Sequence, residues 1–312
     1  MSSSEDKTTV YVAMGANILI AVAKLFAGII SHSSALLAET AHSIADTMNQ
    51  VFLRISLSLG GRPPDEEHPF GYGKERFFWA FMAAIFIFVS GAVFSVADGL
   101  YRLLFSSAEQ GSEFVAYLVL GVAFVAEGTS LVRAARQVRG EAAEAGQPFL
   151  RYIGMSKDPT VKTVLLEDSA AVVGVVLATA GVLLHSLTGH RYWDAGASVA
   201  IGLLLAFVAY RLGTDTKGLL LGKAATPDER ERMRRTILAH EEISQVRQLL
   251  TMYVGPDSVL VAARVALRDG LDADAVEDLA DRIDRDLRRE IPQITEVFVD
   301  PTPEAATRRR DG

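Results

Sequence analysis

The amino-acid sequence predicts an α-helical membrane protein with six transmembrane helices, followed by a small cytosolic α+β domain. Half of the 312 residues are hydrophobic while 22% are charged, so the two kinds of residue must be segregated along the chain. Long apolar segments fill the chain up to about residue 213, and polar sequence with short periodic segments follows Gly222. We therefore expect a transmembrane domain over residues 1–218 and a cytosolic domain over residues 219–312, which ends in a short disordered tail.

Six segments are long and apolar enough to cross a bilayer, which takes about 20 residues in a helix. They cover residues 10–30, 34–60, 77–101, 113–136, 161–187 and 192–213. The acidic start MSSSEDK is too short and carries the wrong charge for a signal peptide, so the first segment is expected to remain as a spanning helix. Lys and Arg gather in the connections 61–76 and 133–162, which predicts that both termini are cytosolic. The expected location is the bacterial inner membrane.

The sequence after Gly222 has the pattern of a small folded domain. A helix start at Thr226-Pro227 is followed by two strand-like segments joined by Gly255-Pro256-Asp257, then an amphipathic helix with Leu279 and Ile283 on its apolar face, and a last strand over 294–299. The order predicts an α-β-β-α-β ferredoxin-like domain with both helices on one face of the sheet. We find no catalytic motif in it.

Composition excludes several classes of protein and of site. The chain has no cysteine, which rules out disulfides and thiolate metal sites, so any metal must be held by histidine or oxygen ligands. The net charge is −7, and the only basic run is the triplet Arg308, Arg309 and Arg310 near the end. A nucleic-acid partner is therefore not expected.

Ionisable residues inside two of the predicted spans indicate a metal site. Glu39, His42, Asp46 and Asn49 follow each other at i, i+3, i+7 and i+10, so they lie on one stripe of the second helix. The fifth helix carries Glu167 and Asp168 in an apolar run. Charged residues at such depth are costly and usually functional. An imidazole together with carboxylates favours zinc, although a purely structural hydrogen bond between His42 and Asp46 is the alternative.

Other polar residues in the spans allow more than one interpretation. Glu127 and Asp98 are candidates for a further ligand or a proton carrier, or for packing through hydrogen bonds to Ser and Thr. Three histidines in or near the predicted outer connections, His32, His185 and His190, are expected to be solvated.

Three motifs together resemble the cation diffusion facilitator family. They are His42-x-x-x-Asp46 in the second helix, the following connection with His68, Gly71, Gly73 and Lys74, and the acidic residue Asp168 in the fifth helix. The resemblance covers essentially the whole chain, including the number of helices and the α+β end. The adjacent pair Glu167-Asp168 resembles the branch that contains the animal mitochondrial zinc transporter.

The sequence departs from the family pattern at two places. The fifth helix of the family has a ligand four residues before Asp168, where this chain has Val164, so Glu167 and Glu127 are the candidates for the missing ligand. In the connection after the second helix, relatives can hold a second ion through an Asp and two His. Asp65 and His68 are present here, but Tyr72 replaces the later histidine. With His240 as the only histidine after Gly222, we expect no binuclear zinc site in the cytosolic domain.

The resemblance implies a homodimeric zinc/proton antiporter that exports zinc from the cytosol by alternating access, and not an enzyme. The transported substrate is expected to be Zn²⁺, with Mn²⁺, Fe²⁺ and Co²⁺ as alternatives. A membrane scaffold that senses metal without transporting it, and signals through the dimeric domain, is the alternative function. An intramembrane metallohydrolase is disfavoured because the sequence has no His-Glu-x-x-His motif.

Overall fold

The computed structural model describes residues 3–105, 113–144, 146, 148–149, 152, 159–268 and 270–303. The chain forms two compact units. One consists of Met1–Ile55 and Trp79–Asp215, and the other of Ser56–Phe78 and Thr216–Gly312. The expected disordered tail with its arginine triplet, and Arg151 and Lys157 of the basic connection 133–162, lie outside the described residues.

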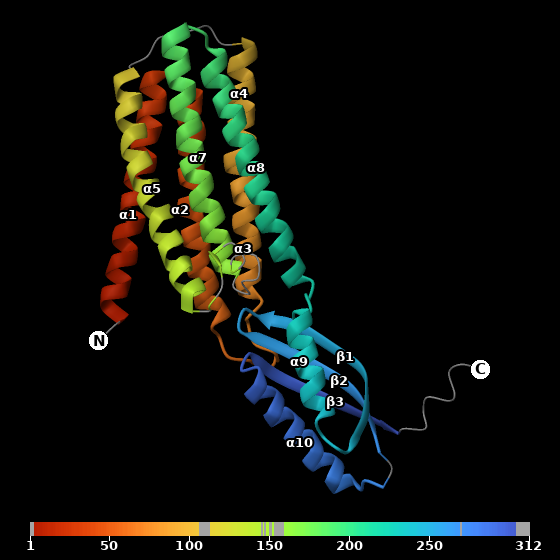
Figure 1. The fold of residues 1–312 in the computed structure, drawn as a ribbon. Helices are drawn as coiled ribbons and strands as arrows, with labels where there is room; N and C mark the ends of the chain where they lie inside the picture. The colour runs from red at the N-terminus through yellow and green to blue at the C-terminus, as the bar shows by residue number, and fades with distance from the viewer. Residues whose placement is uncertain are drawn as a thin grey trace, which may run out of the picture. The chain divides into compact units, whose positions relative to one another are not determined.

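The first unit is a bundle of long helices (Figure 1). Every segment predicted as a span is helical, which confirms the six helices as secondary structure. The third is continuous from α3 to α4, with a π-helical segment, η1, between them. The bounds are α1 Ser3–Ser31, α2 Ser34–Gly60, α3 Glu75–Phe86, η1 Ile87–Val93, α4 Phe94–Phe105, α5 Glu113–Glu144, α7 Pro159–Thr188 and α8 Tyr192–Leu220.

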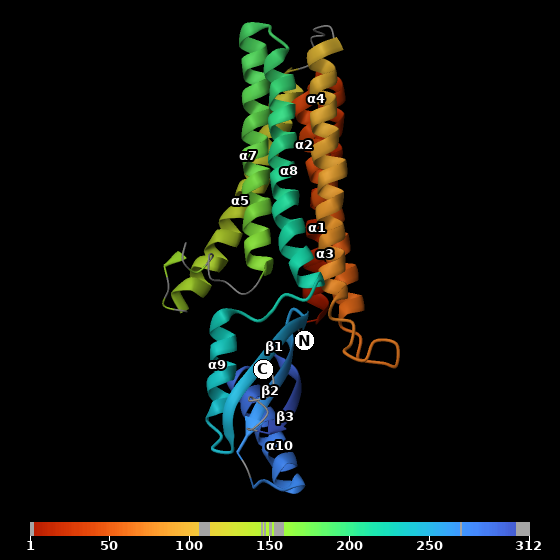
Figure 2. The same cartoon turned by 90° about the vertical axis from the view of Figure 1, so that its right-hand side faces the viewer.

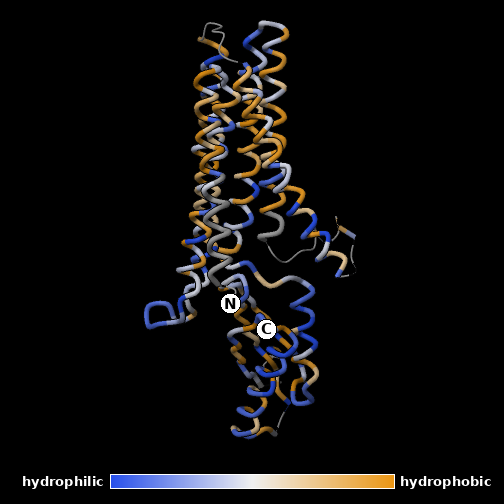
Figure 3. Tube along the Cα trace, turned by 90° about the vertical axis from the view of Figure 1, so that its left-hand side faces the viewer, coloured by the Kyte–Doolittle hydropathy of each residue, from blue (hydrophilic) through white to orange (hydrophobic). Residues whose placement is uncertain are grey.

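Four helices in the described part of the chain are long and apolar enough to cross a membrane: Glu75–Phe105, Glu113–Glu144, Val164–Thr188 and Tyr192–Leu220. Within α1, Asn17–Ser31 forms a shorter apolar helix. Helix α2 has 27 residues, enough to cross a membrane, but its stripe of ionisable residues lowers its hydropathy. Figure 3 shows hydrophobic residues along the helices of this unit, with polar positions among them.

Helices α4 and α8 pack closely because glycine replaces a side chain at their contact. A Cβ atom on Gly202 would lie 2.6 Å from Val96 Cγ2 and 2.9 Å from both the Ala92 carbonyl oxygen and the Val96 nitrogen. Two of these three atoms belong to the backbone and cannot rotate away. Small residues that let helix backbones approach are typical of helix contacts in membranes.

Gly202→Val is therefore expected to destabilise the protein by about 3 kcal/mol or more, because overpacking against backbone forces the two helices apart. Gly196→Val in the same helix is the matched control, since a Cβ at Gly196 would meet nothing within 4 Å. Thermal unfolding of the purified variants in detergent measures the difference. Equal melting temperatures for the two valine variants would contradict the close packing of α4 against α8.

The second unit contains the predicted α-β-β-α-β order, formed by α9 Pro227–Leu238, β1 Ile243–Gly255, β2 Ser258–Leu267, α10 Ala273–Glu290 and β3 Ile294–Pro303. The strands form one sheet in the order β1-β2-β3. Strands β1 and β2 are antiparallel, and β2 and β3, which α10 connects, are parallel. Figure 2 shows both helices of this unit beside the sheet.

Both helices contribute to one hydrophobic core with the sheet, which confirms the predicted layer arrangement. Met233 and Ile237 of α9 and Ile283 of α10 are fully buried in it, together with Val261 of β2. The predicted start of α9 is also confirmed: Thr226 and Glu229 form a reciprocal capping box with Pro227 in the first turn.

Candidate metal site

Helix α2 presents its polar stripe to the other helices of its unit. Glu39 and His42 are buried, with 0% and 7% of their surface exposed, and Asp46 and Asn49 are partly buried. Apolar residues on another side of the helix, such as Ile44, are exposed. The polar stripe of α2 therefore points toward the interior of the bundle, with Glu39 and His42 buried there.

Two carboxylates of α7 meet groups from α2 and α5. Asn49 donates hydrogen bonds to both carboxylate oxygens of Glu167, at 3.0 and 2.9 Å. Ser130 of α5 donates its hydroxyl to Asp168 at 3.1 Å. The contact with Asn49 brings Glu167 next to the stripe of α2, and the contact with Ser130 joins Asp168 to α5. They also show that Asn49 orients Glu167, a role that the sequence alone does not reveal.

The imidazole of His42 is buried with both ring nitrogens unpartnered among the described residues. Buried polar atoms without a hydrogen bond are uncommon and call for an explanation. A role as a metal ligand would explain the missing hydrogen bonds, because the neutral imidazole ring offers a nitrogen lone pair to a metal ion. Asp46, one turn further along α2, interacts electrostatically with His42 and with Asp168 of α7.

These side chains lie within electrostatic range of one another but do not form a coordination shell. In the part of the chain that the structure describes, no three His, Asp or Glu side chains are close enough together to hold a metal ion. The assignment of His42, Asp46, Glu167 and Asp168 as ligands thus stays a prediction. Val164, which takes the place of a ligand, is 39% exposed.

A buried lysine that was not among the predicted site residues lies in this region. Lys24 of α1 is completely buried. Its ammonium donates hydrogen bonds to Glu39 at 3.0 Å and to Ser43 at 2.9 Å, and lies 3.6 Å from a carboxylate oxygen of Glu127. The same rule that singled out the carboxylates applies to a lysine in an apolar helix, so Lys24 was detectable. Glu39 and Glu127, both considered as further ligands, are each paired with it.

Asp65 and His68, the two candidate ligands that remain in the connection between α2 and α3, contact other groups of the protein. Asp65 accepts hydrogen bonds from the Tyr72 hydroxyl at 2.7 Å and from the backbone of His68 at 2.7 Å. The rings of His68 and Tyr72 lie against each other, with centroids 4.1 Å apart. The Tyr72 hydrogen bond, followed by the backbone one, lowers the pKa of Asp65. Tyr72 therefore binds one of the two oxygens that an ion would use.

Each of the two glycines in this connection is required by the backbone structure, for a different reason. Gly71 has a φ of 76°, a conformation that glycine adopts without strain. Gly73 lies against the β1–β2 hairpin, where a Cβ would be 2.6 Å from the Val254 carbonyl oxygen. The Gly-x-Gly pattern is thus explained by backbone geometry and not by a ligand.

Other polar candidates have partners within the protein. Asp98 forms an ion pair with Arg102 at 3.2 Å and accepts a hydrogen bond from Ser34, which favours the packing interpretation. In the α+β unit, His240 lies 3.5 Å from the carboxylate of Asp286.

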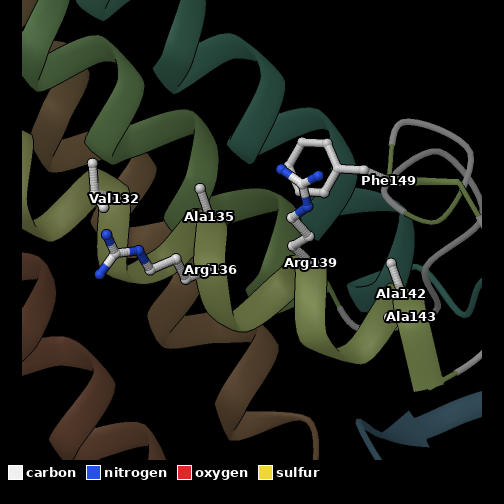
Figure 4. Close-up of a pocket in the computed structure, with 7 residues that line it drawn as sticks. All are labelled: Val132, Ala135, Arg136, Arg139, Ala142, Ala143 and Phe149. Atoms are coloured by element: carbon white, nitrogen blue, oxygen red, sulfur yellow. The ribbon is translucent and has the colours of Figure 1, made fainter.

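A cavity of about 540 Å³ lies at the C-terminal end of α5. Figure 4 shows Arg136 and Arg139 along its wall, with Phe149 near Arg139. Among the residues that the structure describes, the cavity is lined by Val132, Ala135, Arg136, Arg139, Ala142, Ala143 and Phe149, of which the two arginines are the charged ones. Their positive charge disfavours a cation.

Comparison with known proteins follows the two-part organisation of the chain. Residues 10–221 match the cation efflux transmembrane domain, and residues 225–304 match the cytoplasmic domain of cation efflux proteins. The chain belongs to the cation efflux family. It is accordingly an integral membrane protein, and the family consists of transporters and not of enzymes.

Relatives within the cation efflux family differ in the metal that their names specify. The chain is 31% identical to metal tolerance protein C4 of Arabidopsis thaliana over 85% of its length, and 32% identical to the mitochondrial proton-coupled zinc antiporter SLC30A9 of Homo sapiens over 82%. The matches span 58% and 45% of those longer proteins. The manganese efflux system protein MneP of Bacillus subtilis is 23% identical over 94% of both chains.

Replacing Tyr72 with histidine is expected to create a second zinc site in this member of the cation efflux family. Tyr72→His supplies the histidine that resemblance to the family places there, and it frees the Asp65 oxygen. We expect one additional zinc ion per protomer, measured by equilibrium dialysis and elemental analysis. The gain should disappear in Tyr72→His/Asp65→Ala, and no gain in the single variant would show that the connection does not form a site.

Proposed function

We propose that this cation efflux protein exchanges zinc for protons and exports zinc from the cytosol by alternating access. His42 and Asp46, here named the transport pair, bind the ion together with Asp168, and Glu167 completes the site directly or through water. The buried imidazole of His42, which has no hydrogen-bond partner among the described residues, is the observation that carries the proposal. The name of the human relative, a proton-coupled zinc antiporter, supports the choice of ion and of coupling.

Proton coupling follows from the chemistry of the ligands. A metal ion binds deprotonated carboxylates and neutral imidazole, so binding competes with protons. A higher proton concentration on the far side of the membrane therefore favours release of the ion there. Rocking of one group of helices against the other exposes the same ligands to the two sides in turn.

The proposed assembly is a homodimer in the bacterial inner membrane with six spans per protomer and both termini in the cytosol. Helices α1 and α2 supply the two spans beyond the four that are long and apolar enough to cross a membrane. The polar stripe of α2 faces other helices, as spanning helices with charged residues require. The match of residues 225–304 to a family domain named for dimerisation supports the dimer.

Manganese is the second candidate substrate, because MneP, a manganese efflux protein, matches nearly the whole chain. Oxygen ligands suit Mn²⁺, whereas the imidazole of His42 favours Zn²⁺ over it. Fe²⁺ and Co²⁺ belong in the same comparison. A sensing scaffold that binds metal without moving it is the alternative function, and a flux measurement separates it from a transporter.

Purified protein reconstituted into liposomes tests the proposal. Zinc, manganese, iron and cobalt are added outside, and uptake is followed with and without an acidic lumen. We expect zinc uptake to be fastest and to fall when a protonophore collapses the gradient. Uptake that is indifferent to the gradient would contradict proton exchange, and absence of flux for every ion would favour the sensing scaffold.

A further inference from the structure

The strongest unexplained feature of the helical unit is the cluster of the buried Lys24, Glu39 and Ser43 with the partly exposed Glu127, here named the lysine cluster. An ammonium group has three hydrogens to donate and accepts none. Lys24 donates to Glu39 at 3.0 Å and to Ser43 at 2.9 Å, and a Glu127 oxygen lies at 3.6 Å. Three helices, α1, α2 and α5, thus meet around one positive charge.

The groups around the ammonium form a cation position. They are two carboxylates and one hydroxyl, the type of oxygen ligands that hard divalent ions prefer. Lys24 contributes +1 and the two glutamates −2, so the cluster carries −1 when all three are charged. Without the lysine, two uncompensated carboxylates would match the charge of one divalent ion.

The carboxylate of Glu39 contacts Lys24 on one side and helix α7 on the other. A Cβ atom on Gly174 of α7 would lie 2.2 Å from Glu39 Oε1, so the glycine leaves the space that this oxygen occupies. Oε1 is buried and has no hydrogen-bond partner among the described residues. The carboxylate is therefore held between Lys24 and the backbone of α7, with one oxygen left available.

The lysine cluster adjoins the transport pair. Glu39 precedes His42 by three residues and Ser43 follows it directly. Lys24 interacts electrostatically with both His42 and Asp46. An ion bound at the cluster would be a close neighbour of an ion bound by the pair, and the two would repel each other.

We propose that the ammonium of Lys24 fills a cation position beside the transport pair and thereby keeps a second divalent ion out. Glu39 and Glu127 are its counter-ions and not ligands of the transported metal. Lys24 is thus a specificity-determining residue, which limits the helical unit to one metal ion. The inference rests on the proposed function for the location of the transported ion, but its test counts bound ions and does not depend on flux.

The test compares zinc binding to the purified full-length protein in detergent. Lys24→Met removes the charge while keeping a long side chain. We expect it to bind one more zinc ion per protomer than the parent, and we expect zinc to raise its melting temperature more than that of the parent. Lys217→Met, at an exposed lysine of α8, is the matched control and should bind as the parent does.

The variant Lys24→Met/Glu39→Gln tests the role of Glu39 even if Lys24→Met fails to fold, because it removes one charge of each sign and leaves the cluster at its original net charge of −1. We expect it to bind the same number of zinc ions as the parent. A lower number would identify Glu39 as a ligand of the transported metal and overturn the proposal. An unchanged number in folded Lys24→Met would overturn it as well.

Failure of this inference is distinguishable from failure of the proposed function. If Lys24→Met gains an ion but the parent moves none in liposomes, the cation position exists and the transport proposal is wrong. If the parent transports zinc and Lys24→Met gains nothing, transport stands and Lys24 has a structural role in joining α1, α2 and α5.

Discussion

Asp46→Asn is expected to lower zinc transport by at least about 100-fold, because replacing a residue that only supports a ligand already costs 10- to 100-fold in metal affinity. The amide keeps the size of the carboxylate and removes its charge. Asp168→Asn should have a similar effect if α7 contributes directly to the site. Initial rates of zinc uptake into liposomes, with equal amounts of reconstituted protein, measure both.

Two further variants make this expectation specific. Glu167→Gln should have a smaller effect than Asp46→Asn if Glu167 acts through water and an equal one if it is a direct ligand. Asp215→Asn changes the same chemistry at an exposed position of α8 and should transport zinc as the parent does. If both Asp46→Asn and Asp168→Asn transported zinc at nearly the parental rate, the transport site could not lie between α2 and α7.

His42→Asp is expected to shift selectivity toward manganese, with the ratio of manganese to zinc flux rising about tenfold, a difference of about 1.4 kcal/mol between the two ions. The physical reason is that an all-oxygen site loses the preference of imidazole for zinc over manganese. Competition between the two ions for uptake into the same liposomes gives the ratio directly.

The experiment needs a control that adds a carboxylate without removing the imidazole. Asn49→Asp lies on the same stripe of α2 and serves this purpose, although it also breaks the hydrogen bonds to Glu167. Its ratio should stay closer to that of the parent. An unchanged ratio in His42→Asp would exclude His42 as a ligand of the transported ion.

The helices and their order were predictable because hydropathy and periodicity are local properties of the chain. Helix α2 begins and ends where the sequence analysis placed it, at residues 34 and 60. The α+β unit was equally accessible, since its helix start and hairpin turn depend on neighbouring residues. The inward orientation of Glu39 and His42 followed from a rule on the cost of charge in lipid.

Contacts between distant segments were not predictable in the same way. The pairing of Asn49 with Glu167 and of Ser130 with Asp168 depends on which helices are neighbours, and spacing within one helix does not reveal that. Gly202 has no local signature either, because its role is set by Ala92 and Val96 of another helix. Lys24 differs from these residues, because the cost of a charge in an apolar helix applies to a lysine as much as to a carboxylate and can be recognised from the sequence.

The π-helical segment Ile87–Val93 determines the direction in which the side chains of α4, the next part of the same span, point. A π turn contains more residues than an α turn, and each residue of an α-helix advances the direction of the side chain by about 100°. If the segment took α geometry with all its residues kept, the extra residue would rotate α4 by roughly that angle. Gly99, where a Cβ would lie 2.9 Å from the Ala195 carbonyl oxygen, would then turn away from α8, and a bulkier side chain would take its place. The length of this segment is therefore as much a packing constraint as the glycines themselves.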